Sequence, residues 1–266
     1  MAGGVEKLGH PEPGHSHLAF TDRLPQGIRW YLEALADLLF PPQCPGCGRV
    51  GVVLCDTCLA HFEAIGPPYC RKCGQPLEEG DLCSMCRRGR FHHLDWARSA
   101  AVFQSPLREA VHDFKYQSNT RLAEPLARYM EDHLPAEILD VDALIPVPLH
   151  PKRHRERGYN QAALLARHLS RATHIPVRED ILVRVRYTRP QVNLGFRERI
   201  ANMEGAFAVV DSAPVRGRSF LLIDDVMTSG STLEACARAL KEAGAARVIA
   251  YTLARASFLS LDISAR

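Results

Sequence analysis

The sequence has no long hydrophobic run. No stretch of about 18 uncharged apolar residues, the length that crosses a bilayer, occurs in its 266 residues. The first 25 residues also lack the apolar segment of a secretion signal, because they are rich in Gly, Pro and His and carry charges such as Glu6 and Lys7. We therefore expect no membrane span and a cytoplasmic location.

A large charge of one sign is also missing. The formal net charge is +3, which is too small for a basic coat that binds nucleic acid over a whole surface. Hydrophobic residues make up 46% of the chain, enough to bury one full core and a small second module. The composition is that of an ordinary globular protein, so local patterns have to indicate its function.

Cysteine spacing is the most regular of these patterns. Eight of the nine cysteines form four CxxC pairs: Cys44/Cys47, Cys55/Cys58, Cys70/Cys73 and Cys83/Cys86. Disulfides are not expected in a reducing compartment, so the pairs indicate metal or redox chemistry. Two CxxC turns complete a tetrahedral shell of four thiolates around zinc, and four spaced pairs favour zinc over a thioredoxin-like redox motif. The pattern predicts two structural zinc ions, since no coordination position is left open.

The pairing of these turns follows from loop length. Short loops close at the lowest entropic cost, which favours residues 44 to 58 on one zinc and residues 70 to 86 on the other. A crossed arrangement stays open. Few apolar residues lie between Cys44 and Cys86, so we expect metal binding to supply much of the folding free energy, and a core separate from that of the later domain. Cys236 lies on the apolar face of a predicted helix and is expected in the core.

Beyond residue 92, short apolar runs alternate with amphipathic segments. Strands are predicted over 97–103, 143–148, 206–210, 220–223 and 247–254, and helices over 105–116, 121–134, 160–172 and from about 231 to Gly244. Another amphipathic helix is predicted over 27–40, where it packs on its neighbours or binds a partner. The alternation predicts a parallel sheet with helices on both faces, and ligands outside the carboxyl ends of the strands.

One such strand end carries an unusual group of polar residues. Asp224 and Asp225 follow the apolar run 220–223, and then come Thr228, Ser229, Gly230, Ser231 and Thr232. Free N–H groups at a helix start attract an anion, hydroxyls add donors, and glycine permits close approach. Two carboxylates repel phosphate but accept hydrogen bonds from a vicinal diol. The group predicts a ribose 5-phosphate ligand, and the alternative is two helix-start acids before a polar turn.

Several stretches resemble known families. "FLLIDDVMTSGSTL" is similar to the signature with which type I phosphoribosyltransferases bind phosphoribosyl pyrophosphate (PRPP). "IPVPLHPKRHRERGYNQ", "YTRPQVNLGFRERIANMEGAF" and "LLFPPQCPGCG" resemble the late-competence ComF (GntX-like) family from residue 35 onward. The resemblance implies an α/β fold, a type I phosphoribosyltransferase-like parallel sheet flanked by helices, with a small N-terminal double zinc ribbon of four-cysteine sites. The predicted domains are an extension (1–40), the double ribbon (41–92), the phosphoribosyltransferase domain (93–258) and a tail (259–266).

The same resemblance implies roles for individual residues. Asp224 and Asp225 would bind the ribose hydroxyls, and residues 228–232 the 5-phosphate. The loop after "IPVP", with Pro148, would hold the pyrophosphate and its Mg²⁺, and residues 188–199 would close over the site. Residues 150–199 hold twelve Lys or Arg against four acids, which suits a polyanion. Arg153 and Arg157 are expected to face the pyrophosphate and Arg197 or Arg199 to swing in, although each alone could belong to a solvated basic face.

Three functions fit these patterns. The first is transfer of a phosphoribosyl group from PRPP to an unassigned acceptor, through a transition state with oxocarbenium character. The second is a regulator that binds PRPP without turnover. The third, implied by the resemblance through DNA uptake in natural competence, is the handling of single-stranded DNA together with DNA-processing proteins. The hood over the acceptor is expected within 93–140, with Lys115 and Tyr116 near the site, although these two could equally be a helix terminus and its core anchor.

The charge distribution predicts weak binding of single-stranded DNA. Residues 41–98 hold seven Lys or Arg and six acids, and eight thiolates on two Zn²⁺ make this segment net negative by about three. The stronger basic field lies at 150–199, where PRPP is expected. Fluorescence anisotropy of a labelled oligonucleotide should show affinity that falls steeply with salt and is competed by Mg²⁺-PRPP. Tight binding that persists in saturating PRPP would contradict the prediction.

Overall fold

The computed structural model describes residues 35, 37–187 and 202–256. The chain divides into two units, residues 1–41 and 42–266, and the description that follows concerns the second. The helix predicted over 27–40 lies largely outside the described residues. The segment 188–199, with Arg197 and Arg199, lies wholly outside them.

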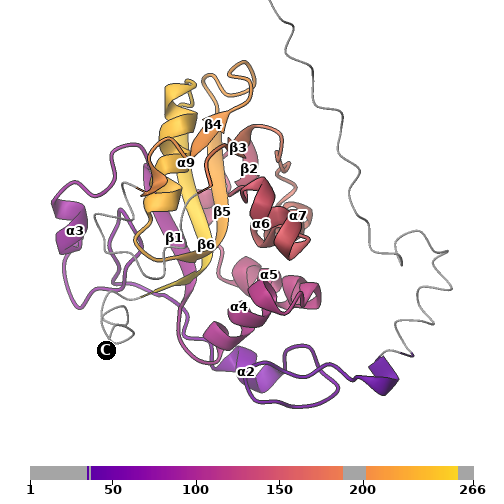
Figure 1. Cartoon of the computed structure of the whole chain (residues 1–266). Coiled ribbons are helices and arrows are strands. Elements are labelled where there is room, and N and C mark those ends of the chain that lie inside the picture. Colours follow the sequence, from indigo (N-terminus) through magenta and orange to yellow (C-terminus); the bar gives the residue numbers. More distant parts are fainter. Residues whose placement is uncertain (1–34, 36, 188–201, 257–266) are drawn as a thin grey trace, which may run out of the picture. The chain divides into compact units, whose positions relative to one another are not determined.

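A parallel sheet forms the centre of this unit (Figure 1). It has four strands in the order β1, β6, β5, β2. Their bounds are β1 Trp96–Val102, β2 Ala143–Pro146, β5 Ser219–Met227 and β6 Arg247–Arg255. In the register, Leu221 pairs with both Leu144 and Ile249. The apolar runs of β2, β5 and β6 are those expected of parallel strands that are buried on both faces.

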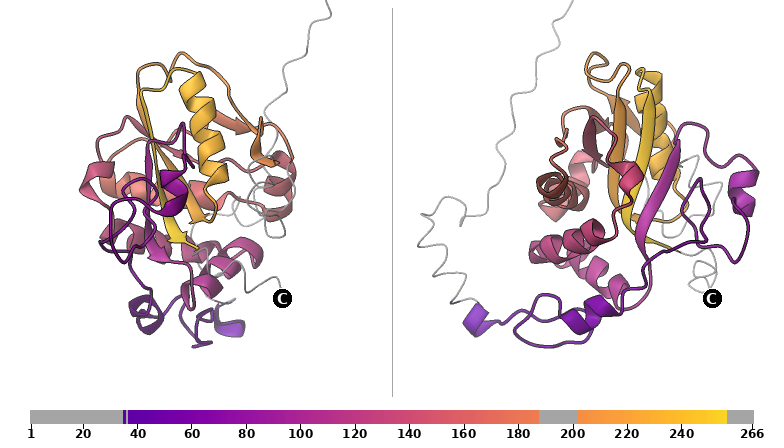
Figure 2. Two further views of the ribbon diagram at one scale, coloured as in Figure 1. Left: turned by 90° about the vertical axis from the view of Figure 1, so that its left-hand side faces the viewer. Right: turned by 180° about the vertical axis from the view of Figure 1, so that it is seen from behind.

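Helices cover both faces of the sheet (Figures 1 and 2). Three of them are α4 Leu107–Tyr116, α5 Ala123–Asp132 and α7 Gln161–Thr173. Their buried side chains form one hydrophobic cluster with Ile223 and Tyr251. On the other face, α9 Ser231–Glu242 packs in a second cluster with Phe220 and Ala250. The α/β fold predicted from the sequence is confirmed.

Two predictions for segments outside the four-stranded sheet differ from the structure. The strand expected over 206–210 forms β4 Phe207–Val209, but it pairs antiparallel with the short β3 Leu182–Arg184 outside the main sheet. The segment after β2, expected as a loop, contains the helix α6 Pro151–Arg157. Pro151 occupies the first turn, and Gly158 ends the helix in a left-handed conformation. Two short 3₁₀ helices, Thr120–Leu122 and Ala136–Ile138, complete the connections.

The cysteine segment, residues 41–92, has two halves that lie against opposite faces of the sheet. Cys44, Cys55 and Cys58 belong to the cluster that contains α4 and α5, whereas Cys70, Cys73 and Cys83 belong to the cluster that contains α9. The expectation that residues 41–92 have a separate core is therefore wrong, because each half of this segment packs into a core of the sheet. The domain boundaries given above stay predictions.

The cysteine segment also covers an edge of the sheet. β1 is an edge strand, and an edge strand exposes unpaired backbone groups. The N–H of Val102 donates to Glu63 O at 2.8 Å, and the N–H of Ile65 donates to Ala100 O at 3.0 Å. The N–H of Ala97 donates to Lys72 O at 2.9 Å. The cysteine segment thus completes the hydrogen bonding of the first strand.

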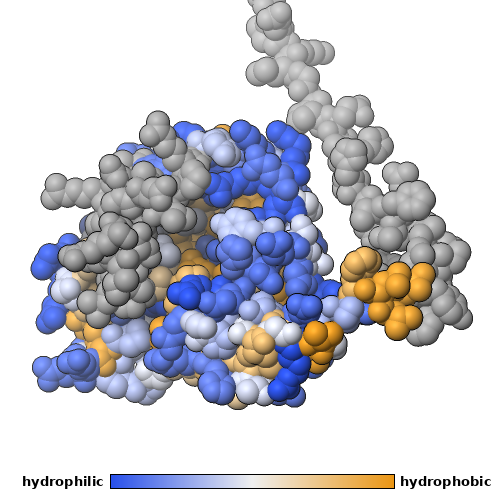
Figure 3. Space-filling model, turned by 60° about the horizontal axis from the view of Figure 1, so that its bottom comes forward, coloured by the Kyte–Doolittle hydropathy of each residue, from blue (hydrophilic) through white to orange (hydrophobic). Residues whose placement is uncertain are grey.

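The surface shows no sign of a membrane-spanning element among the described residues. None of their helices has both the length and the apolar composition to cross a bilayer. Hydrophilic residues also dominate the face drawn in Figure 3.

Candidate functional site

The paired cysteines form two clusters of four. One cluster contains Cys44, Cys47, Cys55 and Cys58, and the other contains Cys70, Cys73, Cys83 and Cys86, with the sulfur atoms of each within 4.8 Å of one another. Two sulfur pairs, Cys47–Cys55 and Cys73–Cys83, are 3.6 and 3.8 Å apart. A tetrahedron with Zn–S bonds of about 2.3 Å has an edge of about 3.8 Å. Both clusters fit structural zinc, and the sequential pairing is confirmed over the crossed one.

Local backbone structure holds these thiols in place. Cys55 caps α2 Asp56–Ala60 and Cys83 caps α3 Ser84–Arg87. Their sulfurs accept the N–H groups of Cys58 and Cys86, each at 3.4 Å. Gly74, one residue beyond its pair, has a φ of +68°, and a Cβ there would lie 2.9 Å from Ala97 O. A left-handed turn pressed against β1 requires glycine.

Two arginines lie beside the second cluster. Arg255, at the end of β6, donates to Cys73 O at 2.9 Å, and its Nη2 lies 3.4 Å from Cys73 Sγ. The neighbouring Cys86 thiol, together with the charges of Arg255 and Arg90, outweighs burial and lowers the pKa of Cys73 to about 4. Zinc binds the thiolate, so these charges favour the form that holds the metal.

The acidic pair lies inside a strand. Asp224 and Asp225 belong to β5, which continues to Met227, whereas the sequence predicted that the strand ends before them. The ladder with β6 continues because Asp224 pairs with Thr252 and Val226 with Ala254. Both carboxylates line a cavity of about 420 Å³. It lies at the carboxyl end of the sheet, where open α/β sheets bind ligands.

The two carboxylates have different environments. Asp225 is 6% exposed, and its Oδ1 lies 2.9 Å from Lys115 Nζ. Burial, and next the Asp225 charge, raise the pKa of Asp224 to about 7, while the Lys115 charge opposes the shift. Lys115 and Tyr116 both line the cavity, which confirms the expectation that they lie near the site.

Basic residues also line this cavity, and we call them its basic wall. Arg153, Arg157 and Pro148 all border the same cavity. Arg157 donates to Gln161 Oε1 at 2.6 Å, and its guanidinium carbon lies 5.4 Å from the centroid of the Tyr116 ring. Arg184 also lines the cavity, although no motif of the sequence indicated it. Its strand, β3, has only three residues, too few to give a periodic signal.

The hydroxyl-rich loop divides between two cavities. Thr228 and Thr232 line the cavity of the acidic pair, whereas Ser229 and Ser231 line a second cavity of about 530 Å³. Ser229 Oγ and Ser231 Oγ are 2.9 Å apart. Gly230 has a φ of +74°, and a Cβ there would lie 2.7 Å from Phe91 Cζ. Glycine is thus required by the left-handed turn and by close contact with Phe91.

These features define a class of protein. A parallel sheet with an acidic pair, a hydroxyl-rich loop and a basic wall at its carboxyl end is the architecture of the phosphoribosyltransferase fold. The family model "Phosphoribosyl transferase domain" matches residues 156–261, and the model "Double zinc ribbon domain" matches residues 35–87. The chain therefore has a phosphoribosyltransferase domain preceded by a double zinc ribbon.

Curated relatives narrow the class to one family. Competence protein F of Haemophilus influenzae is 32% identical over 212 residues, which cover 76% of this chain and 90% of the relative. DNA utilization protein YhgH of Escherichia coli K12 is 33% identical with the same coverage. Competence protein ComFC of Bacillus subtilis is 30% identical and covered to 84%. The chain belongs to the family of competence protein F and YhgH.

Solved structures give more distant matches. Glutamine PRPP amidotransferase from B. subtilis has a TM-score of 0.32 and 21% identity, over 51% of this chain and 26% of that one. Purine phosphoribosyltransferase from Pyrococcus horikoshii has a TM-score of 0.28 and 16% identity, over 53% of this chain and 84% of that one. The chain thus spans about a quarter of the amidotransferase.

We expect the purified protein to contain two zinc ions and to lose stability as a whole without them. The cysteines pack in the same clusters as the sheet, so a chelator should lower the melting temperature of the entire domain. Elemental analysis measures the metal, and circular dichroism should show one transition at lower temperature. An unchanged second transition from the sheet would show that the cores are independent.

Asp224→Asn should stabilise the protein more at high pH than at low pH. The pKa of Asp224 is raised from 3.8 to about 7 in the folded state, so folding binds a proton between these values. The free energy of unfolding of the wild type therefore falls as pH rises through this window, and the asparagine variant escapes the loss. Urea denaturation at pH 4 and 8 should show a difference between the two proteins that grows by on the order of 4 kcal/mol.

The control for this experiment is built into the substitution. Asparagine keeps the Oδ1 atom that accepts the N–H of Asp225 at 2.9 Å, so the backbone contact is preserved while the charge is removed. A difference in unfolding free energy that is the same at both pH values would show that Asp224 ionises normally.

Proposed function

We propose that this protein binds PRPP in the cavity of about 420 Å³ and transfers its phosphoribosyl group, with release of pyrophosphate. The observation that carries the proposal is the meeting of three kinds of group in one cavity. Carboxylates come from β5, threonine hydroxyls from the start of α9, and guanidinium groups from α6. These suit a diol, a monophosphate and a pyrophosphate.

The carboxylates divide the work on the ribose hydroxyls. Asp225 forms an ion pair with Lys115, which fixes the direction of its carboxylate. Asp224 has a pKa near 7, so it accepts hydrogen bonds most strongly once it has lost its proton. The acidic pair therefore binds the 2′- and 3′-hydroxyls, and neither carboxylate has to contact a phosphate.

The basic wall serves the leaving group. In the transfer, the bond from the anomeric carbon to a pyrophosphate oxygen breaks, its electron pair leaves with pyrophosphate, and the acceptor forms a new bond to the carbon. Arg153 and Arg157, which border the cavity, neutralise charge that develops on pyrophosphate in this proposal. Arg197, outside the described residues, adds a further charge in this proposal. No protein nucleophile is required.

Magnesium belongs to this proposal as a partner of PRPP. The site provides carboxylate oxygens in Asp224 and Asp225, and Mg²⁺ prefers oxygen ligands from carboxylates and substrate phosphates. Bound with the pyrophosphate, Mg²⁺ would neutralise part of the charge on the leaving group.

The relatives support a context for the activity. Their names, competence protein F and DNA utilization protein YhgH, connect them with the use of DNA. We extend this to the present chain as a role in the cytoplasm, with single-stranded DNA and DNA-processing proteins as partners. The acceptor of the phosphoribosyl group stays unassigned.

Binding of PRPP should be visible as thermal stabilisation. Mg²⁺-PRPP should raise the melting temperature of the wild type by ligand linkage, and the double variant Asp224→Ala, Asp225→Ala should abolish the shift. Glu137→Ala, which removes an exposed acid from a short 3₁₀ helix, is the matched control and should keep it. An undiminished shift in the double variant would refute the assignment of the acidic pair.

Release of pyrophosphate separates the catalytic form of the proposal from a binding regulator. The wild type is incubated with Mg²⁺-PRPP and a panel of bases and nucleotides. Pyrophosphate released with one acceptor and absent from the double variant supports transfer. Binding without release by any acceptor supports the regulator.

A further inference from the structure

The phosphate-binding loop rests on the second cysteine segment. Arg90 lies four residues after Cys86, and its Nη2 donates to Thr228 O at 3.2 Å and also to Ser229 O. Both carbonyls belong to the loop that carries the proposed 5-phosphate contacts. Phe91 packs beside Gly230 in the same loop, so the two residues form a support under it.

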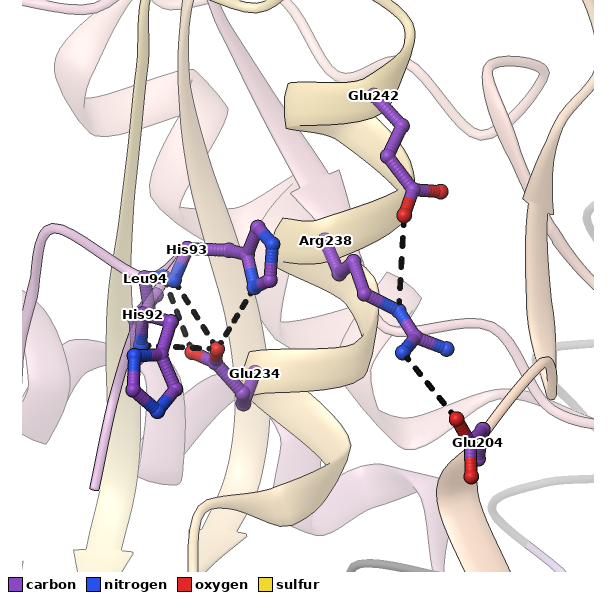
Figure 4. Close-up of polar contacts among 7 residues, drawn as sticks. All are labelled: His92, His93, Leu94, Glu204, Glu234, Arg238 and Glu242. Atoms are coloured by element: carbon purple, nitrogen blue, oxygen red, sulfur yellow. Dashed lines mark hydrogen bonds and ion pairs between the residues drawn. The ribbon is translucent and has the colours of Figure 1, made fainter. Parts of the chain in front are cut away.

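A carboxylate on α9 fixes this support (Figure 4). Glu234 Oε1 accepts the N–H groups of His92 and His93, both at 3.0 Å, and lies 2.9 Å from His93 Nδ1. Its Oε2 accepts the N–H of Leu94 at 3.0 Å. Glu234 lies in the first turn of α9, which begins at Ser231. This turn therefore holds residues 92–94, and the adjacent Arg90 holds the loop that precedes α9.

The cysteine cluster anchors the other end of the support. Arg255 ties Cys73 to the end of β6, and Cys83 caps the helix α3 that leads to Arg90. Arg90 itself follows the cluster residue Cys86 by only four residues, so the position of its guanidinium depends on the assembled cluster.

The contacts of Arg90 have a direction that matters for an anion. In a trans peptide, the C=O and the following N–H point in opposite directions. Arg90 draws the carbonyls of Thr228 and Ser229 toward itself, so the N–H groups of Ser229 and Gly230 are directed away from Arg90. Those are N–H groups of the kind that a phosphate at a helix start binds.

We propose that Arg90 is a positioning residue for the 5-phosphate, and that the second cysteine cluster, through Arg90 and Glu234, sets the conformation of the phosphate-binding loop. This inference rests on the proposed binding of PRPP. The second zinc ribbon is then a structural part of the ligand site, although it touches no ligand. Its contribution is specific to the 5-phosphate, because the pyrophosphate faces the residues of α6.

Binding of three probes to the full-length, zinc-loaded protein tests the proposal. Calorimetry is carried out with Mg²⁺-PRPP, ribose 5-phosphate and inorganic pyrophosphate. Arg90→Ala should lower the affinity for Mg²⁺-PRPP and for ribose 5-phosphate by roughly tenfold or more, as loss of charged hydrogen bonds implies. Its affinity for pyrophosphate should stay close to that of the wild type. Arg90→Lys, which keeps a donor, should recover part of the loss. Arg88→Ala removes a neighbouring exposed arginine and should bind all three probes normally.

A second pair of variants acts away from the cluster. Glu234→Gln should also lower the affinity for ribose 5-phosphate, because the side chain that holds residues 92–94 loses its charge. Glu242→Gln is its matched control on α9, where Glu242 is exposed and contacts only Arg238 among the residues drawn in Figure 4. Zinc content is measured for each variant, and Glu234→Gln decides the matter if Arg90→Ala loses metal.

The outcomes separate this inference from the proposed function. If the wild type does not bind PRPP, the proposed function fails and this inference with it. If the wild type binds PRPP, and both Arg90→Ala and Glu234→Gln bind ribose 5-phosphate as tightly as it does, only the inference is overturned. Equal losses for ribose 5-phosphate and pyrophosphate would also overturn it, because they would indicate general damage to the site.

Discussion

Charge compensation at the second cysteine cluster is the interaction on which much of this structure depends. A zinc ion with four thiolates carries two net negative charges, and burying them is costly unless positive groups lie beside them. The buried guanidinium of Arg255 and the half-buried one of Arg90 provide those charges. Arg255 is buried at the end of β6, where its guanidinium contacts both the carbonyl and the sulfur of Cys73. Metal site and sheet therefore require each other, which is a stronger link than two domains joined by a linker.

This mutual requirement explains the way the cysteine segment is built into the fold. Its first half packs on the face that carries α4 and α5, its second half on the face that carries α9, and the stretch between them hydrogen-bonds to the edge of β1. The double zinc ribbon thus contacts both faces of the sheet and the edge strand β1. The zinc ions would stabilise this segment, because it has few apolar residues of its own.

The ligand cavity also contains buried charge that neighbouring groups compensate. Its carboxylates belong to β5, a central strand of the sheet, and burial is acceptable there because Lys115 pairs with Asp225 while Asp224 keeps a proton up to a pH near 7. Strands and helices thus fix the polar groups before a ligand arrives. Preorganised groups of this kind bind without the cost of ordering loops. The phosphate-binding loop, residues 228–232, is the exception, since its conformation depends on contacts with Arg90 and Phe91.

The sequence by itself determined the class of the fold, the two cysteine clusters and several of the polar residues that line the ligand cavity. Periodicity and spacing are local properties, so they predicted β5, α9 and the four CxxC turns. The side chains at the end of the apolar run predicted a ligand site at Asp224 and Thr228. The sequential pairing of the cysteines followed from loop length alone. Tertiary structure decided what depends on contacts between distant segments. Strand β5 continues through the two aspartates because β6 pairs with it, and β3, with Arg184, is too short to show a pattern. The ribbon and the sheet share cores because cysteines from both halves of the ribbon pack among residues of distant helices and strands. At the second cluster Arg90 and Arg255, separated by more than half of the chain, also meet, and no local pattern records such a meeting.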